Sequence, residues 1–253
     1  MLHDPSQIIE AVQRLTVPYR LGHLHSCYSY YPVKILVIED QRMVREMLVL
    51  ACTEAVPSAV VSDAADGASG LARCRQMNPD LIILDLELPD CDGLSLVKDF
   101  FECTASVRII VLSSHTDEFT VHRALRANVH GFVDKKEQPV KIIAEAMKAV
   151  MAGEQYLSSL VQRARASLRA DPSAFNKLLS DREQELLGLL GLGLSNDEAC
   201  KLLHLSAHTV KNHRRNIMAK LGIHGTPRLI RYADEKGFTR VALRTHRLSG
   251  SAP

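Results

Sequence analysis

The sequence of 253 residues contains no tryptophan, and only 5% of its residues are aromatic. It has no apolar run as long as a membrane span. Asp4, Glu10 and Arg14 interrupt the N-terminal segment, so we expect no secretory signal there. The six cysteines are scattered, without CxxC or CxxxC pairs. These absences argue against a membrane partner, a zinc knuckle and a disulfide framework, and they favour a cytoplasmic protein with reduced thiols.

Charge is divided unevenly along the chain, although the formal net charge is only +2. Residues 33–152 carry 13 Lys and Arg against 18 Asp and Glu, whereas residues 153–253 carry 16 against 9. The length also exceeds what one compact core usually holds. We therefore expect two domains, the second of which is basic enough to suit a polyanion such as DNA.

Short apolar runs alternate with amphipathic segments in the first domain. The runs are rich in Val, Ile and Leu and cover 33–38, 59–61, 81–84, 107–112 and 131–133. Helical patterns cover 41–55, 66–77, 93–102, 117–127 and 137–152. Such runs fit strands that are buried on both faces. The alternation predicts an α/β fold with a doubly wound, five-stranded parallel sheet.

Polar residues follow four of the predicted strands. Glu39 and Asp40 end the first strand, Asp85 the third and Ser113 the fourth, and Lys135 follows the fifth. The carboxyl ends of parallel strands form the ligand edge of such a sheet. Converging carboxylates suit Mg²⁺, and a carboxylate beside that ion can attack phosphorus. Alone, each residue is more often a cap, a turn residue or a solvated charge, but together they predict a phosphoryl-transfer site.

In these features residues 33–152 resemble the receiver domains of bacterial response regulators, which have a flavodoxin-like fold. The segment from Asp85 to Gly93 resembles the stretch around the family's phosphoacceptor. The resemblance implies that Asp85 is the nucleophile, that Ser113 and Lys135 contact the phosphoryl group, and that Ser113 and Phe132 form the switch. It also implies Mg²⁺ ligands, namely Glu39, Asp40, Asp85 and the backbone carbonyl of Glu87.

The second domain shows three helix starts in succession. Ser180 and Glu183 form one capping box, Ser195 and Glu198 form another, and Ser206 is the next N-cap. Gly222 ends the third helix. Two short capped helices joined by a tight turn predict a helix-turn-helix within an all-α, four-helix domain.

The third helix, about 207–221, has an apolar face and a basic face. Val210, Ile217 and Leu221 recur at helical spacing and should face the core. A solvated basic face is common, but the second helix of a helix-turn-helix is the one that enters the major groove. Residues 179–237 resemble the LuxR/NarL-type DNA-binding domain. The resemblance implies base contacts from Lys211, Asn212 and Arg215, and phosphate contacts from Ser206, Thr209 and Lys220.

The remaining segments are assigned less specifically. Residues 1–32 are an N-terminal extension that matches no motif. Residues 153–178 are read as a partly helical linker, and residues 238–253 as a basic, mobile tail.

Together, the two resemblances imply a response regulator of the NarL/FixJ type that controls transcription. A sensor histidine kinase would phosphorylate Asp85, and the protein would then bind double-stranded DNA as a homodimer. It would not be an enzyme beyond its own phosphoryl transfer and autodephosphorylation. The alternatives are a phosphoaspartate phosphatase, a LuxR-type sensor of a small molecule, and a regulator that binds proteins with weak or no DNA binding. We rank all three lower. A phosphatase needs a substrate pocket and a cap, where this chain has a predicted DNA-binding domain, and a small-molecule sensor needs an aromatic cage, whereas this chain has no tryptophan and a full acidic set. Electrophoretic shifts with promoter fragments would distinguish the third.

Overall fold

The structure is a computed structural model that describes residues 32–137 and 139–248. Most of the expected N-terminal extension and the last five residues of the expected tail lie outside this range. The described residues belong to one compact unit. No helix among them has the length and apolar character needed to cross a bilayer.

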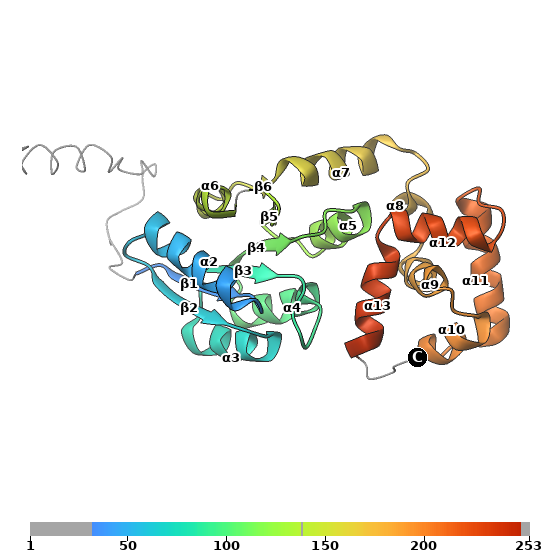
Figure 1. Cartoon of the computed structure of the whole chain (residues 1–253), viewed down its shortest axis with the longest axis horizontal. Helices are drawn as coiled ribbons and strands as arrows, with labels where there is room; N and C mark the ends of the chain where they lie inside the picture. The colour runs from blue at the N-terminus through green and yellow to red at the C-terminus, as the bar shows by residue number, and fades with distance from the viewer. Residues whose placement is uncertain (1–31, 138, 249–253) are drawn as a thin grey trace, which may run out of the picture. The chain divides into compact units, whose positions relative to one another are not determined.

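The first half of the described chain is built on a parallel sheet with strand order β2-β1-β3-β4-β5-β6 (Figure 1). Its strands are β1 (Lys34–Ile38), β2 (Val60–Ala64), β3 (Leu81–Asp85), β4 (Arg108–Ser113), β5 (Gly131–Asp134) and β6 (Tyr156–Leu157). Every residue of β3 is buried, as expected for a strand that is covered on both faces. All strands are parallel, but the chain adds β2 on one side of β1 and then adds β3 on its other side. The carboxyl ends of β1 and β3 therefore flank the switch point at which such folds bind ligands.

Helices cover both faces of this sheet. They are α2 (Arg42–Ala55), α3 (Gly67–Met77), α4 (Gly93–Cys103), α5 (Glu118–Arg126), α6 (Pro139–Met151) and α7 (Ser159–Ala170). Leu48 of α2 and Ile143 of α6 belong to the apolar core on one face. Phe100 of α4, Val121 of α5 and Val161 of α7 belong to the core on the other face. The predicted fold class is confirmed, and the helix bounds agree with the expected ones to within two residues.

The sheet extends beyond the five expected strands. Residues 156–157, which were read as part of a linker, form β6 and pair in parallel with Gly131 and Phe132 of β5. Helix α7 follows, and Val161 and Leu168 on it are buried. The sequence did not reveal this strand because a strand of two residues is too short to show a periodic pattern. Its few apolar residues become significant only when they pack against the finished sheet.

The second half is helical. Its helices are α8 (Phe175–Leu178), α9 (Asp181–Gly191), α10 (Asn196–Leu203), α11 (Ala207–Lys220), α12 (Thr226–Glu235) and α13 (Phe238–Leu248). Both predicted capping boxes are present, at the starts of α9 and α10. His204 takes a left-handed conformation with φ of 52° and so makes the tight turn between α10 and α11. The predicted helix-turn-helix is confirmed.

Helix α13 corrects the expectation of a mobile tail from residue 238. Phe238 is fully buried, and it anchors the new helix in the core formed by α8 to α12. Glycines of α9 allow the close approach, because a Cβ on Gly188 would lie 3.1 Å from Ala242, and one on Gly191 would lie 2.7 Å from Thr239. The basic composition of this segment suggested a solvated tail and concealed its apolar face.

Candidate functional site

Three carboxylates meet at the carboxyl ends of β1 and β3, as predicted. Glu39, Asp40 and Asp85 each place an oxygen within 4.8 Å of the others. Glu39 is 0% exposed and Asp85 is 1% exposed, whereas Asp40 is exposed at the rim. The parallel register pairs Ile38 with Leu84, so the acidic residues that follow the two strands are brought together. The site is therefore deep on one side and open to solvent on the other.

Lys135 completes this cluster from the end of β5. Its Nζ lies 2.7 Å from Oε2 of Glu39 and 2.8 Å from Oδ2 of Asp85. The two carboxylates raise the pKa of Lys135 above its usual value in spite of burial, which acts in the opposite direction. Lys135 thus stays protonated and offsets part of the repulsion between its two neighbours.

The cluster still carries excess negative charge. Burial, followed by the nearby Asp85 carboxylate, raises the pKa of Glu39 to about 7. Apart from the Lys135 ammonium, Oε2 of Glu39 and Oδ2 of Asp85 have no partner among the described residues. Oxygen ligands with free lone pairs and an open solvent side fit a hard divalent cation that keeps part of its water shell. The residues present could therefore hold such an ion.

The surroundings of Asp85 restrict its carboxylate. The amide of Glu87 donates a hydrogen bond to its Oδ1 at 3.0 Å, which leaves Oδ2 toward Lys135. The chain also passes close behind it at Gly93, where a Cβ would lie 2.2 Å from the Asp85 carbonyl oxygen. No side chain fits between these two backbones, so the glycine in this motif has a steric cause.

Ser113 lies beside this centre at the end of β4. It follows Leu112, which is the register partner of Asp85. Its Oγ accepts a hydrogen bond from the amide of His115 at 3.0 Å, and Nε2 of His115 lies 3.0 Å from Oε1 of Glu87. A small cavity of about 30 Å³ lies between these residues. Burial and the guanidinium of Arg240 lower the pKa of His115, so its ring is mostly neutral near pH 7.

Phe132 is 0% exposed and belongs to the core on the α4 and α5 face of the sheet. Its neighbour Leu157 on β6 belongs to the same core. The ring lies inward in this structure, and its role as a switch stays a prediction.

A second candidate site is the exposed face of α11. Val210 and Ile217 are buried, and Leu221 is half-buried, as predicted. On the opposite face Lys211 and Arg215 are exposed and Asn212 is half-buried. A hollow of about 490 Å³ runs beside these cations and is lined by Asn196, Lys211, Arg214, Arg215, Met218, Ala219, Gly222, Ile223 and His224. Cationic and amide groups on one exposed helix can read base edges and bind phosphates.

The residues predicted to contact phosphates already have partners within the domain. Ser206 caps α11 by accepting a hydrogen bond from the amide of Thr209 at 3.1 Å, and the two hydroxyls lie 2.8 Å apart. Nζ of Lys220 lies 2.6 Å from Oε2 of Glu183, so it ties the end of α11 to the start of α9. These contacts leave the predicted phosphate roles of the three residues untested.

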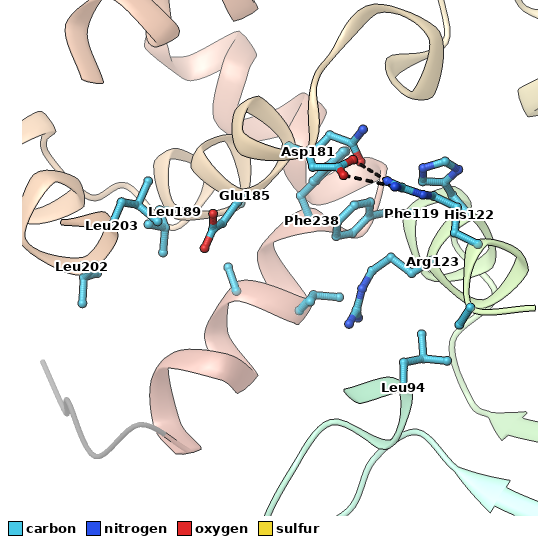
Figure 2. Close-up of a pocket in the computed structure, with 16 residues that line it drawn as sticks. Leu94, Phe119, His122, Arg123, Asp181, Glu185, Leu189, Leu202, Leu203 and Phe238 are labelled. Carbon is cyan, nitrogen blue, oxygen red and sulfur yellow. Dashed lines mark hydrogen bonds and ion pairs between the residues drawn. The ribbon is translucent and has the colours of Figure 1, made fainter. Parts of the chain in front are cut away.

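Sequence reasoning missed two sets of residues. Arg214 donates hydrogen bonds to Asn196 at 3.1 Å and to Thr226 at 2.6 Å, and so braces α11 against the starts of α10 and α12. The other set joins α5 to α13, where Phe119 stacks on Phe238 with ring centroids 3.9 Å apart (Figure 2). The spacing of Phe238, Val241 and Ala242 is a helical signal that could have revealed α13, but its partner on α5 could not have been found from spacing.

Comparison with protein families places both sites in known domains. The response regulator receiver domain matches residues 35–147, and the bacterial regulatory proteins of the luxR family match residues 177–233. Among solved structures, RcsB from Salmonella enterica serovar Typhimurium bound to a promoter shares the fold. Its TM-score is 0.56 at 22% identity, over 81% of this chain and 99% of that one.

Characterised relatives match along nearly their whole length. The Fimbriae Z protein of Salmonella typhimurium is 32% identical over 80% of this chain and 96% of its own length. The response regulator protein VraR of Staphylococcus aureus is 30% identical over 79% of this chain and 96% of its own. Given these matches, the chain belongs to the response regulators that combine a receiver domain with a LuxR-type helix-turn-helix, a family of DNA-binding transcription regulators.

Proposed function

We propose that Asp85 accepts a phosphoryl group from a sensor histidine kinase and that this modification controls operator binding by α11. The observation that carries the proposal is the cluster of Glu39, Asp40 and Asp85 around the ammonium of Lys135. A single carboxylate at a strand end would be an ordinary turn residue. Three that converge beside a lysine, at the switch point of a parallel sheet, fit phosphoryl transfer.

The reaction is a transfer between two nucleophiles. An oxygen of Asp85 attacks the phosphorus of a phosphohistidine, and the new P–O bond forms as the P–N bond breaks. The bonding electron pair stays on the imidazole nitrogen, which leaves as the neutral ring of the kinase. With acetyl phosphate the P–O bond to the acetyl group breaks instead, and acetate leaves.

Six groups of this chain support that step. Glu39, Asp40, Asp85 and the backbone carbonyl of Glu87 would hold Mg²⁺. When bound, the ion neutralises charge that develops on the transferred oxygens. Lys135 lies close enough to Oδ2 of Asp85, at 2.8 Å, to pair with a phosphoryl oxygen attached there. The Ser113 hydroxyl would donate a hydrogen bond to another.

The DNA-binding step uses the opposite face of α11 from the core. Lys211, Asn212 and Arg215 would contact bases, and Ser206, Thr209 and Lys220 would contact phosphates. Paired half-sites on DNA imply a two-fold protein, so the phosphorylated form is a homodimer. The protein acts in the cytoplasm and catalyses no reaction other than its own phosphorylation and dephosphorylation.

The phosphoryl-transfer part is tested with acetyl phosphate, Mg²⁺ and intact-mass analysis. Wild type should gain the mass of one phosphoryl group, and Asp85→Asn should gain none. Asp80→Asn is the matched control, because Asp80 ends the preceding loop and binds the amide of Lys34 at 2.8 Å, away from the cluster. Equal labelling of wild type and Asp85→Asn would show that another residue is the acceptor.

The DNA-binding part is tested by selecting sequences from a random double-stranded library with the phosphorylated protein. Arg215→Ala should weaken binding to the selected sequence by about 1–3 kcal/mol and relax specificity at one position. Lys148→Ala, an exposed lysine on α6, should leave binding unchanged. Failure to enrich any sequence would favour the alternative regulator that acts through protein contacts.

A further inference from the structure

Lys135 reaches the acidic cluster from a tight turn at the end of β5. The turn begins at Asp134, the last residue of β5, and the amide of Glu137 donates a hydrogen bond to the carbonyl of Asp134 at 3.1 Å. A second bond closes the same turn, because the amide of Lys136 donates to Oδ1 of Asp134 at 2.9 Å. Asp134 therefore supplies both acceptors of a turn in which Lys135 is the second residue.

Neighbouring segments hold the start of this turn. The amide of Lys135 donates to the carbonyl of Ser113 on β4 at 2.9 Å, and the amide of Asp134 donates to Oγ of Ser158 at 3.2 Å. Ser158 lies between β6 and α7 (Figure 1), is 2% exposed and donates its own amide to the carbonyl of Phe132 at 2.9 Å. All four backbone amides of the turn therefore have an acceptor, which fixes the position from which the Lys135 side chain starts.

The burial of Asp134 makes its carboxylate an expensive way to close a turn. The residue is 0% exposed, and while its Oδ1 accepts the amide of Lys136, its Oδ2 has no partner among the described residues. A buried carboxylate with an unpaired oxygen lowers folding stability. An apolar side chain would suit this place better if packing alone decided, so the carboxylate points to a role other than stability.

The ammonium of Lys135 is a group whose place matters. Its Nζ lies within 2.8 Å of both Glu39 and Asp85, although lysine carries its charge at the end of a long and flexible stem. A rigid turn beneath that stem limits the positions that the ammonium can take. Fixing a charged group in advance near the reacting oxygens lowers the entropy that the reaction must lose.

We propose that Asp134 is a positioning residue for phosphoryl transfer, because its buried carboxylate closes the turn that directs Lys135 toward Asp85. The proposal rests on the proposed function and adds a residue that controls the rate of the step without touching the phosphoryl group. Asp134 acts through Lys135, so the effect of removing its carboxylate should disappear when the lysine is absent.

Four substitutions in the full chain test this role. Asp134→Ala removes the acceptor of the Lys136 amide, whereas Asp134→Asn keeps an acceptor oxygen there and removes only the charge. Asp171→Ala is the matched control, since Asp171 is exposed and its Oδ1 accepts the amide of the residue two positions later, Ser173, at 2.8 Å. Lys135→Ala, alone and combined with Asp134→Ala, completes a double-mutant cycle.

The first readout is the rate of phosphorylation by acetyl phosphate at saturating Mg²⁺, followed by intact-mass analysis. Asp134→Ala should react about tenfold more slowly than wild type, which is the loss expected when the partner that orients a functional group is removed. Asp134→Asn should restore the rate, and Asp171→Ala should match wild type. In the Lys135→Ala background, Asp134→Ala should slow the reaction no further.

The second readout is the binding of Mg²⁺ alone, measured by calorimetry. The ammonium of Lys135 competes with a cation for Glu39 and Asp85, so Lys135→Ala should bind Mg²⁺ more tightly than wild type. Asp134→Ala should also bind it more tightly, because its lysine is no longer held beside the two carboxylates. General loosening of the fold would instead weaken Mg²⁺ binding, so this readout separates positioning from a merely structural role.

The outcomes separate the two proposals. If wild type is labelled and Asp134→Ala reacts at the same rate, the positioning role is wrong. Slower labelling of Asp134→Ala together with weaker Mg²⁺ binding would also overturn it, as would an equal slowing in the presence and absence of Lys135. No labelling of wild type would overturn the proposed function, and the positioning role with it.

Discussion

Lys135 is the residue on which the acidic site depends most directly. It is the positive group within 2.8 Å of both Glu39 and Asp85, and both carboxylates are almost completely buried. One lysine cannot neutralise three carboxylates, so these groups repel one another until a cation binds. The repulsion favours the binding of a cation, and it lowers the folding stability of the protein when the ion is absent.

We therefore expect Asp85→Asn to stabilise the protein when Mg²⁺ is absent, by about 1 kcal/mol, because it removes one of two buried like charges. Urea unfolding in the presence of a chelator, followed by circular dichroism, measures this. Asp99→Asn on α4, outside the cluster, should have little effect. Adding Mg²⁺ should reverse the order, because only wild type keeps the full ligand set. A less stable Asn variant in chelator would mean that the pairing of Asp85 with Lys135 outweighs its repulsion from Glu39.

Among the helices and strands, the sequence predicts best those whose position is set by residues that lie close together in the chain. The capping boxes of α9 and α10 were readable because both partners lie within four residues of each other. The strand ends were readable because long apolar runs fix β1, β3 and β4. Strand β6 and helix α13 were not, because a two-residue strand has no pattern of its own and the apolar face of α13 acquires meaning only against Gly188 and Gly191 of α9.

The contact between Glu183 and Lys220 links two helices and has a pH signature. Burial acts to raise the pKa of Glu183, but the hydrogen bonds from Lys220 and Ser180 outweigh it and hold the pKa below its usual 4.5. A lowered pKa contributes stability that is present above about pH 4.5 and is lost as pH falls through the folded value. The DNA-binding domain should therefore lose stability below about pH 4.5.

Glu183→Gln should remove that part of the pH dependence and cost about 1–2 kcal/mol at pH 7, because glutamine can keep the capping box but not the charge that pairs with Lys220. Hydrogen exchange of the α9 amides in the full chain reports the loss. Glu198→Gln is the matched control, since Glu198 belongs to the same kind of capping box on an exposed surface, where Lys201 contributes only the smallest of the effects on its pKa. Equal losses in both variants would attribute the effect to the cap alone.

At the scale of the whole molecule, the acidic first half and the basic second half each contain one candidate site, and the two sites suit ligands of opposite charge. The acidic edge suits a cation, and α11 suits a polyanion. The residues that we propose for both sites could be named from the sequence because each lies at a strand end or on one helix face. It could not predict the contact of Phe119 with Phe238, because two residues so far apart in sequence meet only through the tertiary fold.

A protein that reads paired half-sites should change its oligomeric state when it is phosphorylated. We expect a monomer-to-dimer shift in size-exclusion chromatography with light scattering after treatment with acetyl phosphate and Mg²⁺, since paired half-sites on DNA require a two-fold protein. Asp85→Asn should stay in the untreated state. A dimer of equal population before and after phosphorylation would place control at a step other than assembly.

Helix α13 also decides where the chain can be cut. A fragment that ends at residue 233, the last residue of the luxR match, would lack Phe238 and leave the small-residue surface of α9 at Gly188 and Gly191 open to water. Such an apolar surface favours aggregation. The shortest soluble DNA-binding fragment of this protein should therefore extend through residue 248, where α13 ends.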